Sequence, residues 1–135
     1  MTEPYWLSRE ECLALHDMML AFYGGIVGVR DSNLLESALA RPRQLFSYRE
    51  PEMTELAAAY VSGIVKNHPF LDGNKRTGFM MGAGFLERNN YEFYASETEV
   101  VLRTLALAAG ALSEADYAAW LKANSRPRSG GIYGG

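Results

Sequence analysis

Cysteine, excess basic charge and long apolar runs are all scarce in this sequence of 135 residues. The single cysteine, Cys12, excludes an internal disulfide, and its place in an apolar helical pattern favours a buried, unreactive thiol without a function. The formal net charge of −3 disfavours the broad basic surface that non-specific nucleic-acid binding requires. We therefore expect no direct nucleic-acid partner.

No apolar run approaches the roughly 18 residues that a membrane-spanning helix needs. The N-terminal residues 1–6 also lack the basic and apolar regions of a signal peptide. These two absences predict a cytoplasmic protein without a membrane partner. The length and the 48% apolar composition suit one compact domain, predicted over residues 1–125. Residues 126–135 are rich in glycine with little to bury, and we expect them to form a flexible tail.

Apolar residues recur at helical spacing in about six segments, which predicts an all-α fold. The first helix starts at a capping box, Ser8–Glu11, and ends at Gly24-Gly25. A second start signal, Asp31-Ser32, begins a short helix that Pro42 is expected to end, because proline lacks the amide hydrogen that a helix interior needs. Residues 42–51 are then expected to form an exposed loop or flap.

The third helix is predicted from Glu52 to near Asn67, because the residue before Pro69 is disfavoured in helical geometry. Beyond the turn Asp72-Gly73-Asn74, a fourth helix is predicted to end at Asn89-Asn90. Three glycines weaken this helix by nearly ~1 kcal/mol each relative to alanine, so we expect them to allow close approach of a neighbouring helix. They are Gly78, Gly82 and Gly84.

The rest of the chain completes the helical bundle. A short extended piece is predicted at Tyr91–Tyr94, a fifth helix from Ser96 to Gly110, and a last helix from Ser113-Glu114 onward. We expect all of them to pack around the fourth helix. Four aromatic residues fall on apolar stripes and are assigned to the core: Trp6, Tyr60, Tyr117 and Trp120.

The turn before the fourth helix carries the residues best suited to chemistry, over the run His68-Pro69-Phe70-Leu71-Asp72-Gly73-Asn74-Lys75-Arg76-Thr77. A helix N-terminus offers unpaired N–H groups and the positive end of the helix dipole, which together bind phosphate oxygens. Gly73 lets the backbone come near such a ligand. Lys75 and Arg76 add fixed positive charge.

The same run offers a metal ligand and a base. Mg²⁺ takes one or two carboxylates together with waters and substrate phosphates, so Asp72 alone suffices. Histidine is the side chain that exchanges protons most readily near neutral pH, so His68 suits proton uptake from an attacking hydroxyl. Taken singly, these residues are more often turn, solvated or structural residues, but their order at a helix start favours the functional interpretation. The P-loop pattern is absent, and a calcium loop from Asp72 would need glutamate where Ala83 stands.

The run resembles the motif His-x-Phe-x-[Asp/Glu]-Gly-Asn-x-Arg of Fic domains and, more closely, the Asn-Lys-Arg-Thr variant of the Doc branch of the Fic/Doc family. Gly28–Asp31, Leu34–Leu39 and Arg41-Pro42 also look like the N-terminal half of Doc-type toxins, so the resemblance covers most of residues 5–123. It implies a base at His68, a Mg²⁺ ligand at Asp72, a buried anchor at Phe70, and phosphate-binding or catalytic residues at Gly73, Asn74, Lys75 and Arg76.

The resemblance also implies a reaction. Lys75 replaces the second glycine of the AMP-transferring Fic pattern, and Phe79 stands at the place of its final arginine. Doc toxins share both departures and transfer the terminal phosphate of ATP. The chain is thus expected to be a Mg²⁺- and ATP-dependent protein kinase acting on a threonine or serine of elongation factor Tu, which arrests translation and growth. AMP transfer to a protein hydroxyl and a non-catalytic binding module remain as alternatives.

An antitoxin partner is implied by the same resemblance. No inhibitory motif of the form [Ser/Thr]-x-x-x-Glu-[Gly/Asn] stands out in the chain, so restraint is expected from a second protein whose disordered segment folds into a groove beside the site.

A few other residues have less specific signals. His16-Asp17 are adjacent on a helix and point in different directions, so we expect exposed positions without a role. Arg41 and Arg43 border the predicted flap, where they either contact a nucleotide or target or are simply solvated. Phe46 and Tyr48 lie in the same stretch and either form a partner surface or pack onto the flap.

Overall fold

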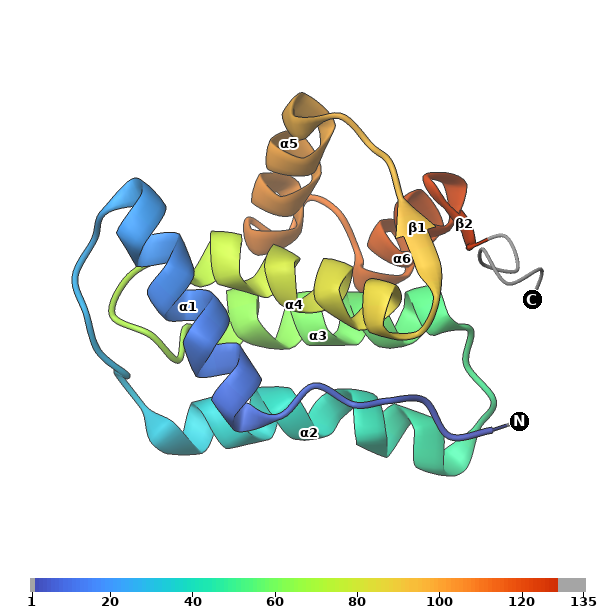
Figure 1. The fold of residues 1–135 in the computed structure, drawn as a ribbon, viewed down its shortest axis with the longest axis horizontal. Coiled ribbons are helices and arrows are strands. Elements are labelled where there is room, and N and C mark those ends of the chain that lie inside the picture. Colours follow the sequence, from blue (N-terminus) through green and yellow to red (C-terminus); the bar gives the residue numbers. More distant parts are fainter. Residues whose placement is uncertain (1, 129–135) are drawn as a thin grey trace.

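The computed structural model describes residues 2–128, which form six helices and one two-stranded sheet (Figure 1). The helices are α1 (Arg9–Tyr23), α2 (Ser32–Tyr48), α3 (Met53–Asn67), α4 (Asn74–Arg88), α5 (Glu97–Ala108) and α6 (Glu114–Ala123). The predicted all-α fold with about six helices is confirmed. None of the helices within residues 2–128 is long and apolar enough to cross a membrane.

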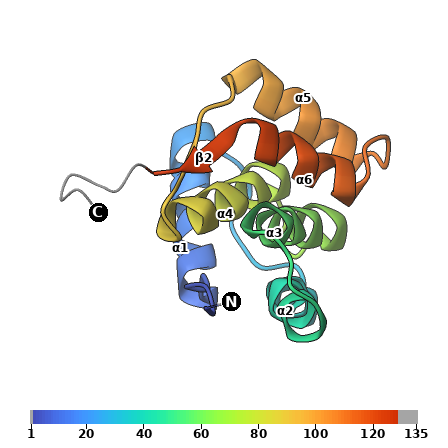
Figure 2. The same cartoon turned by 90° about the vertical axis from the view of Figure 1, so that its right-hand side faces the viewer.

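The centre of the bundle is the pair α3 and α4, with α2 and α6 against α3 and α1 against α4 (Figure 2). α3 is enclosed on all sides, and residues 56–65 are buried without interruption. The side chains of Ala57-Ala58-Ala59 are small, so neighbouring helices can pack close to the backbone of α3 from several directions. The fourth helix thus shares the centre with the third.

Two of the three glycines of α4 are needed for this packing. A Cβ atom on Gly82 would lie 2.5 Å from Cγ2 of Val61, and one on Gly78 would lie 2.9 Å from Cγ1 of Val65. The predicted close helix approach is confirmed at both positions. The prediction is wrong for Gly84, whose Cβ would make an ordinary 3.6 Å contact with Leu7, a residue outside the helices.

α2 does not end at Pro42, and the prediction of an exposed flap over residues 42–51 is wrong. Proline removes one backbone hydrogen bond from a helix interior. Here Pro42 is buried on the same face as Leu35 and Ala38, the face that packs on α3. Burial of this apolar face stabilises the helix through the proline, as tertiary packing commonly overrides local propensity. Only residues 49–52 separate α2 from α3.

The extended piece predicted near Tyr91 is strand β1 (Tyr91–Phe93), which pairs antiparallel with β2 (Ser125–Pro127) (Figure 1). Glu92 lies opposite Arg126, whose Nε donates to the Glu92 carboxylate at 2.7 Å. Arg126 and Pro127, which we had assigned to the flexible tail, therefore belong to the sheet. The predicted tail residues 129–135 lie outside the described residues.

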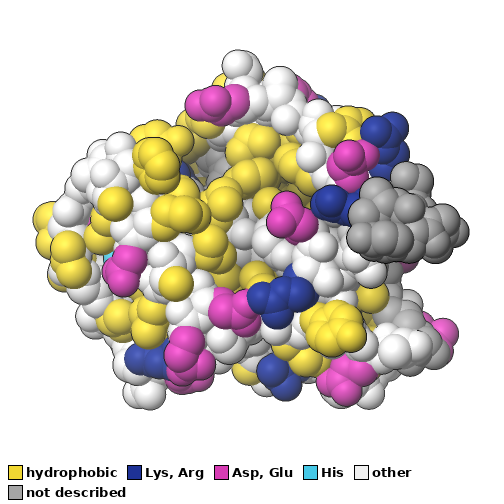
Figure 3. Space-filling view, in the orientation of Figure 1, with side chains coloured by type: hydrophobic (Ala, Val, Ile, Leu, Met, Phe, Trp, Pro, Cys, Tyr) yellow, Lys and Arg dark blue, Asp and Glu magenta, His cyan; other side chains and the backbone are white. Residues whose placement is uncertain are grey.

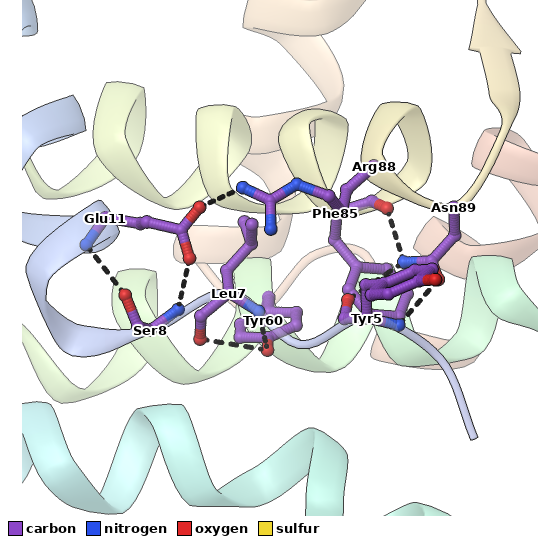
Figure 4. Close-up of polar contacts among 8 residues, drawn as sticks. All are labelled: Tyr5, Leu7, Ser8, Glu11, Tyr60, Phe85, Arg88 and Asn89. Atoms are coloured by element: carbon purple, nitrogen blue, oxygen red, sulfur yellow. Dashed lines mark hydrogen bonds and ion pairs between the residues drawn. The ribbon is translucent and has the colours of Figure 1, made fainter.

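The N-terminal segment is hydrogen-bonded to the C-terminal end of α4 (Figure 4). The backbone N–H and C=O of Tyr5 both bond the side-chain amide of Asn89, at 2.8 and 3.0 Å. The N–H of Leu7 donates to the hydroxyl of Tyr60 at 3.1 Å. Because Tyr60 is fully buried, this bond connects the segment to the core.

The four aromatic residues assigned to the core differ in depth. Tyr60 and Tyr117 are fully buried and Trp120 is nearly so. Trp6 is half-buried and packs against Phe85, with ring centroids 5.9 Å apart. The core assignment is confirmed for the first three and holds in part for Trp6.

Candidate active site

The predicted site residues begin where α3 ends. His68 is the C-cap of α3, exposed, in the left-handed conformation with φ of 52°. This conformation is unfavourable for a residue with a side chain, so surrounding contacts must hold it. The guanidinium of Arg30 supplies them, donating to the carbonyl oxygens of His68 at 2.7 Å and Asn67 at 2.9 Å. Sequence reasoning assigned no such role to Arg30, because the contact joins residues 38 positions apart.

Asn74 connects the histidine to the rest of the loop. Its Oδ1 accepts from the N–H of Phe70 at 3.0 Å, and its Nδ2 donates to the carbonyl of Phe70 at 3.0 Å. This pair of bonds fixes the orientation of the amide, so the atom 3.3 Å from Nδ1 of His68 is the donor Nδ2. In a neutral imidazole, Nδ1 is then the nitrogen without hydrogen. The Asn74 side chain is therefore fully engaged in hydrogen bonds within the loop.

Asp72 is exposed and held by two backbone amides. Oδ1 accepts from the N–H of Gly73 at 2.9 Å, and Oδ2 accepts from the N–H of Ile26 at 3.2 Å. A carboxylate has about four lone-pair sites, so about two remain for another ligand. A Mg²⁺ ion that also takes phosphate oxygens and waters suits such a ligand. Residues 2–128 contain no group of three or more potential metal ligands, so a metal here would depend on Asp72 and substrate oxygens.

The segment between α1 and α2 runs along the loop and was not predicted to do so. Val29 forms a β-bridge with Phe70, and the N–H of Leu71 donates to the carbonyl of Gly28 at 3.0 Å. Gly25 has a φ of 132°, and a Cβ there would lie 2.8 Å from Oδ2 of Asp72. Glycine is therefore required beside the carboxylate.

α4 begins without a side-chain cap. Gly73 is its N-cap in the left-handed conformation, and no side chain among residues 2–128 caps the first amides of the helix. The first N–H groups of a helix have no intrahelical partner and carry the positive end of the dipole. This arrangement is compatible with the predicted anion site, and glycine stands at the position that needs a positive φ.

A cavity of about 470 Å³ lies beside this helix start, between α1, α4 and α5. Hydrophobic side chains surround a hollow in this part of the molecule (Figure 3). Its lining is formed by Met19, Tyr23, Asp72, Gly73, Asn74, Lys75, Arg76, Phe79, Met80, Glu97, Val100, Val101, Thr104 and Leu105. Five of the six predicted site residues are thus brought to one cavity. His68 is outside the lining and reaches it through Asn74.

The two cations of the loop are available to an anionic ligand. Lys75 and Arg76 are exposed and form no ion pair within residues 2–128. The Arg76 guanidinium lies over the ring of Tyr23, 4.0 Å from its centroid, a cation–π geometry that keeps the charge at the cavity. Tyr23 is a site residue that sequence reasoning missed, because only the docking of α1 brings it to the loop.

His16 is buried, so the prediction that it is exposed is wrong. It is 3% exposed, its Nε2 bonds the carbonyl oxygen of Asp72 at 2.8 Å, and its ring stacks on Phe70. Phe70 is itself 1% exposed, as its predicted role of buried anchor requires. A signal was present in the sequence: His16 follows Cys12 by four residues and therefore shares the buried face of α1.

The other candidates lie away from the loop, on α2. Arg41 forms a two-pronged ion pair with Glu114, with distances of 2.7 and 3.3 Å. Arg43 lies over the ring of Trp6. Neither lines the cavity. Phe46 packs edge-on against Trp6, which confirms packing for this residue, though not onto a flap, and Tyr48 is 75% exposed.

Comparisons with known proteins agree with the motif. The Fic/DOC family model matches residues 6–86. Over 117 residues the chain is 32% identical to the "Protein kinase doc" of Escherichia phage P1. The matched region covers 86% of this chain and 92% of that protein. Over 97 residues it is 35% identical to the "Toxin Doc" of Mycolicibacterium smegmatis, covering 70% of this chain and 71% of that protein.

Proposed function

Because the chain belongs to the Fic/DOC family, we propose that it is a toxin that transfers the terminal phosphate of ATP to a threonine or serine hydroxyl of a bacterial translation factor. One relative is named a protein kinase and another a toxin. The observation that carries the proposal is that Asp72, the start of α4 and two cations, Lys75 and Arg76, that form no ion pair in the described part of the chain line one cavity. Such a surface suits a polyphosphate bound with a metal ion.

Each loop residue has a distinct role in this proposal. The first amides of α4, together with Lys75 and Arg76, bind the phosphates and neutralise charge that develops during transfer. Asp72 would hold Mg²⁺, which would supply positive charge to stabilise the phosphates. Phe70 anchors the loop in the core, so that these groups keep their positions.

His68 removes the proton of the attacking hydroxyl. The oxygen–phosphorus bond to the target forms as the bond between the terminal phosphorus and its bridging oxygen breaks, and ADP leaves with that electron pair. An imidazole base needs a nitrogen without hydrogen, which is Nδ1 in the resting geometry. The Asn74 contact to Nδ1 is long at 3.3 Å, so proton uptake at Nδ1 opens a weak bond.

The remaining expectations belong to the same proposal. The target is elongation factor Tu, the activity is cytoplasmic, and an antitoxin restrains the toxin by folding a disordered segment beside the site. The catalytic unit is the single domain formed by the six helices. Departures from the AMP-transferring pattern at Lys75 and Phe79 favour phosphate over AMP as the transferred group.

The test is intact-mass analysis of elongation factor Tu after incubation with the purified protein, ATP and Mg²⁺. We expect a gain of one phosphoryl group, absent with His68→Ala and retained with Asp17→Asn, a change at an exposed position of α1. Loss of a general base costs ~10²- to 10⁴-fold in rate. A gain of one AMP group would replace the kinase by the AMP-transfer alternative. Growth arrest that persists with His68→Ala would replace it by the binding-module alternative.

A further inference from the structure

His16 is buried below the catalytic loop, yet none of the proposed steps uses it. Its ring is nearly parallel to that of Phe70, with centroids 3.8 Å apart and an angle of 9°. Its Nε2 lies 2.8 Å from the carbonyl oxygen of Asp72. A carbonyl only accepts hydrogen bonds, so Nε2 carries the hydrogen and donates.

The bond fixes one particular peptide group. The carbonyl oxygen of the peptide between Asp72 and Gly73 accepts from His16, and the N–H of the same peptide donates to Oδ1 of Asp72. Both ends of the peptide are therefore held. Because the peptide is planar, its orientation sets both the direction of the Asp72 side chain and the start of α4.

Nothing else from another helix performs this task. α4 has no side-chain cap, and within residues 2–128 His16 is the one side chain of another helix that bonds the backbone between Leu71 and Gly73. His16 does not line the cavity, so a ligand there would not touch it. Its influence on a bound group can only pass through the loop.

We propose that His16 is a positioning residue for the transfer reaction: through the Asp72 carbonyl, it orients the Asp72 carboxylate and the first amides of α4. The inference rests on the proposed function of the loop. The proposed effect comes from the N–H donor of His16. It can therefore be tested separately from the packing of the His16 ring on Phe70.

Three variants make that separation. His16→Phe keeps a planar ring against Phe70 and removes the donor. His16→Gln removes the ring but keeps an N–H donor at a similar distance from the backbone. Asp17→Asn changes the neighbouring exposed residue and serves as the matched control. Thermal melts of all variants establish which are folded.

The first readout is transfer of phosphate to the target protein. Partners that orient a ligating group typically contribute 10–100-fold to activity, so we expect His16→Phe to lower kcat by about that factor. The KM for the target protein should stay near that of the unsubstituted protein, and His16→Gln should recover most of kcat. Unchanged kcat in His16→Phe would overturn the inference. So would a larger loss in His16→Gln than in His16→Phe, because ring packing would then be the main cause.

The second readout does not need activity: amide hydrogen exchange at Gly73 and Thr77, whose N–H groups bond Asp72 and Gly73. We expect faster exchange at both in His16→Phe, recovery in His16→Gln, and no change in Asp17→Asn. If the unsubstituted protein transfers nothing, the proposed function fails while this measurement still tests the positioning. Equal exchange in His16→Phe and the unsubstituted protein would contradict it.

Discussion

The guanidinium of Arg30 donates to the carbonyl oxygen of His68 at 2.7 Å, and so holds the backbone of a residue in the left-handed conformation. The same fork bonds Asn67, the last residue of α3. Positive charge at this helix end also interacts favourably with the dipole. The segment after α1 therefore controls where the proposed base lies.

Arg30→Lys keeps the positive charge but loses the two parallel hydrogen bonds of the guanidinium. A lysine ammonium does not match the two carbonyl oxygens of Asn67 and His68 in this way. We expect a loss of about 1 kcal/mol in unfolding free energy, discounted for the exposure of the side chain, together with a lower transfer rate. Urea unfolding and initial rates measure both. Arg9→Lys is the control, because its exposed pair with Glu36 should change stability by less than about 0.5 kcal/mol. Equal losses of stability in Arg30→Lys and Arg9→Lys would show that the paired hydrogen bonds of Arg30 contribute nothing specific.

Asn74→Asp tests the amide that joins Phe70 to His68. The carboxylate would still accept from the N–H of Phe70, but it would face the carbonyl of Phe70 and lose the donor to Nδ1. Asn74 is 5% exposed, so we expect about 1–3 kcal/mol of destabilisation and loss of transfer activity. Denaturant unfolding and mass analysis of the target are the measurements. A variant as stable and active as the unsubstituted protein would refute this arrangement.

Gly82→Ala and Gly84→Ala should act in opposite directions. The first places a methyl group 2.5 Å from Val61 on α3, and overpacking of this kind costs about 1–3 kcal/mol. The second meets only an ordinary 3.6 Å contact, so the better helix propensity should stabilise α4 by nearly ~1 kcal/mol. Equilibrium unfolding in urea compares them directly. Similar unfolding free energies for the two variants would show that α3 and α4 adjust to the added methyl group at little cost.

Cys12 should be unreactive in the folded protein. Burial raises the pKa of its thiol to about 12, and only the thiolate is nucleophilic. A chromogenic disulfide reagent at pH 8 should therefore modify it slowly under native conditions and rapidly in guanidinium chloride. The expected burial of Cys12 is confirmed, and this labelling tests whether the thiol is also inert. Native and denatured labelling rates that agree would place the thiol at the surface.

Glu11 should make stability sensitive to acid. The Ser8 backbone N–H and the ion pair with Arg88 hold the pKa of its carboxyl below the ordinary value of 4.5 (Figure 4). This stabilisation is fully present above about pH 4.5 and is lost as pH falls through the folded-state pKa. Glu11→Gln should thus lower Tm at pH 7, with a difference that shrinks towards pH 3. The exposed neighbour change Glu10→Gln should show no such trend, and a pH-independent difference for Glu11→Gln would exclude the mechanism.

Local signals in the sequence predicted much of the fold and the loop. Ser8, Asp31, Ser96 and Ser113 are N-caps in the structure, because capping depends on neighbours in the chain. The loop motif singled out residues 72–76, which the structure brings to one cavity, but not the lining residues from α1 and α5. The prediction that α2 ends at Pro42 was wrong, because burial of this residue against α3 outweighs its local preference against helix.

Other contributors to the site could not be predicted from local patterns. Arg30 and Tyr23 reach the loop only through the packing of separate segments. His16 lay on a recognisable helical face, but its partner is a backbone carbonyl 56 residues away. Contacts to backbone atoms leave no residue-type signature at the receiving position, so the sequence carries no matching signal there.

α1 buries only two of its residues, Cys12 and His16. Both contacts to Asp72 from outside the loop come from α1 or the residues directly after it, His16 and Ile26. Local opening of α1 would cost less free energy than global unfolding and would release both contacts at once. Because both hydrogen bonds depend on the docking of one helix, opening of α1 alone would release the Asp72 loop while the core of α3 and α4 stays folded.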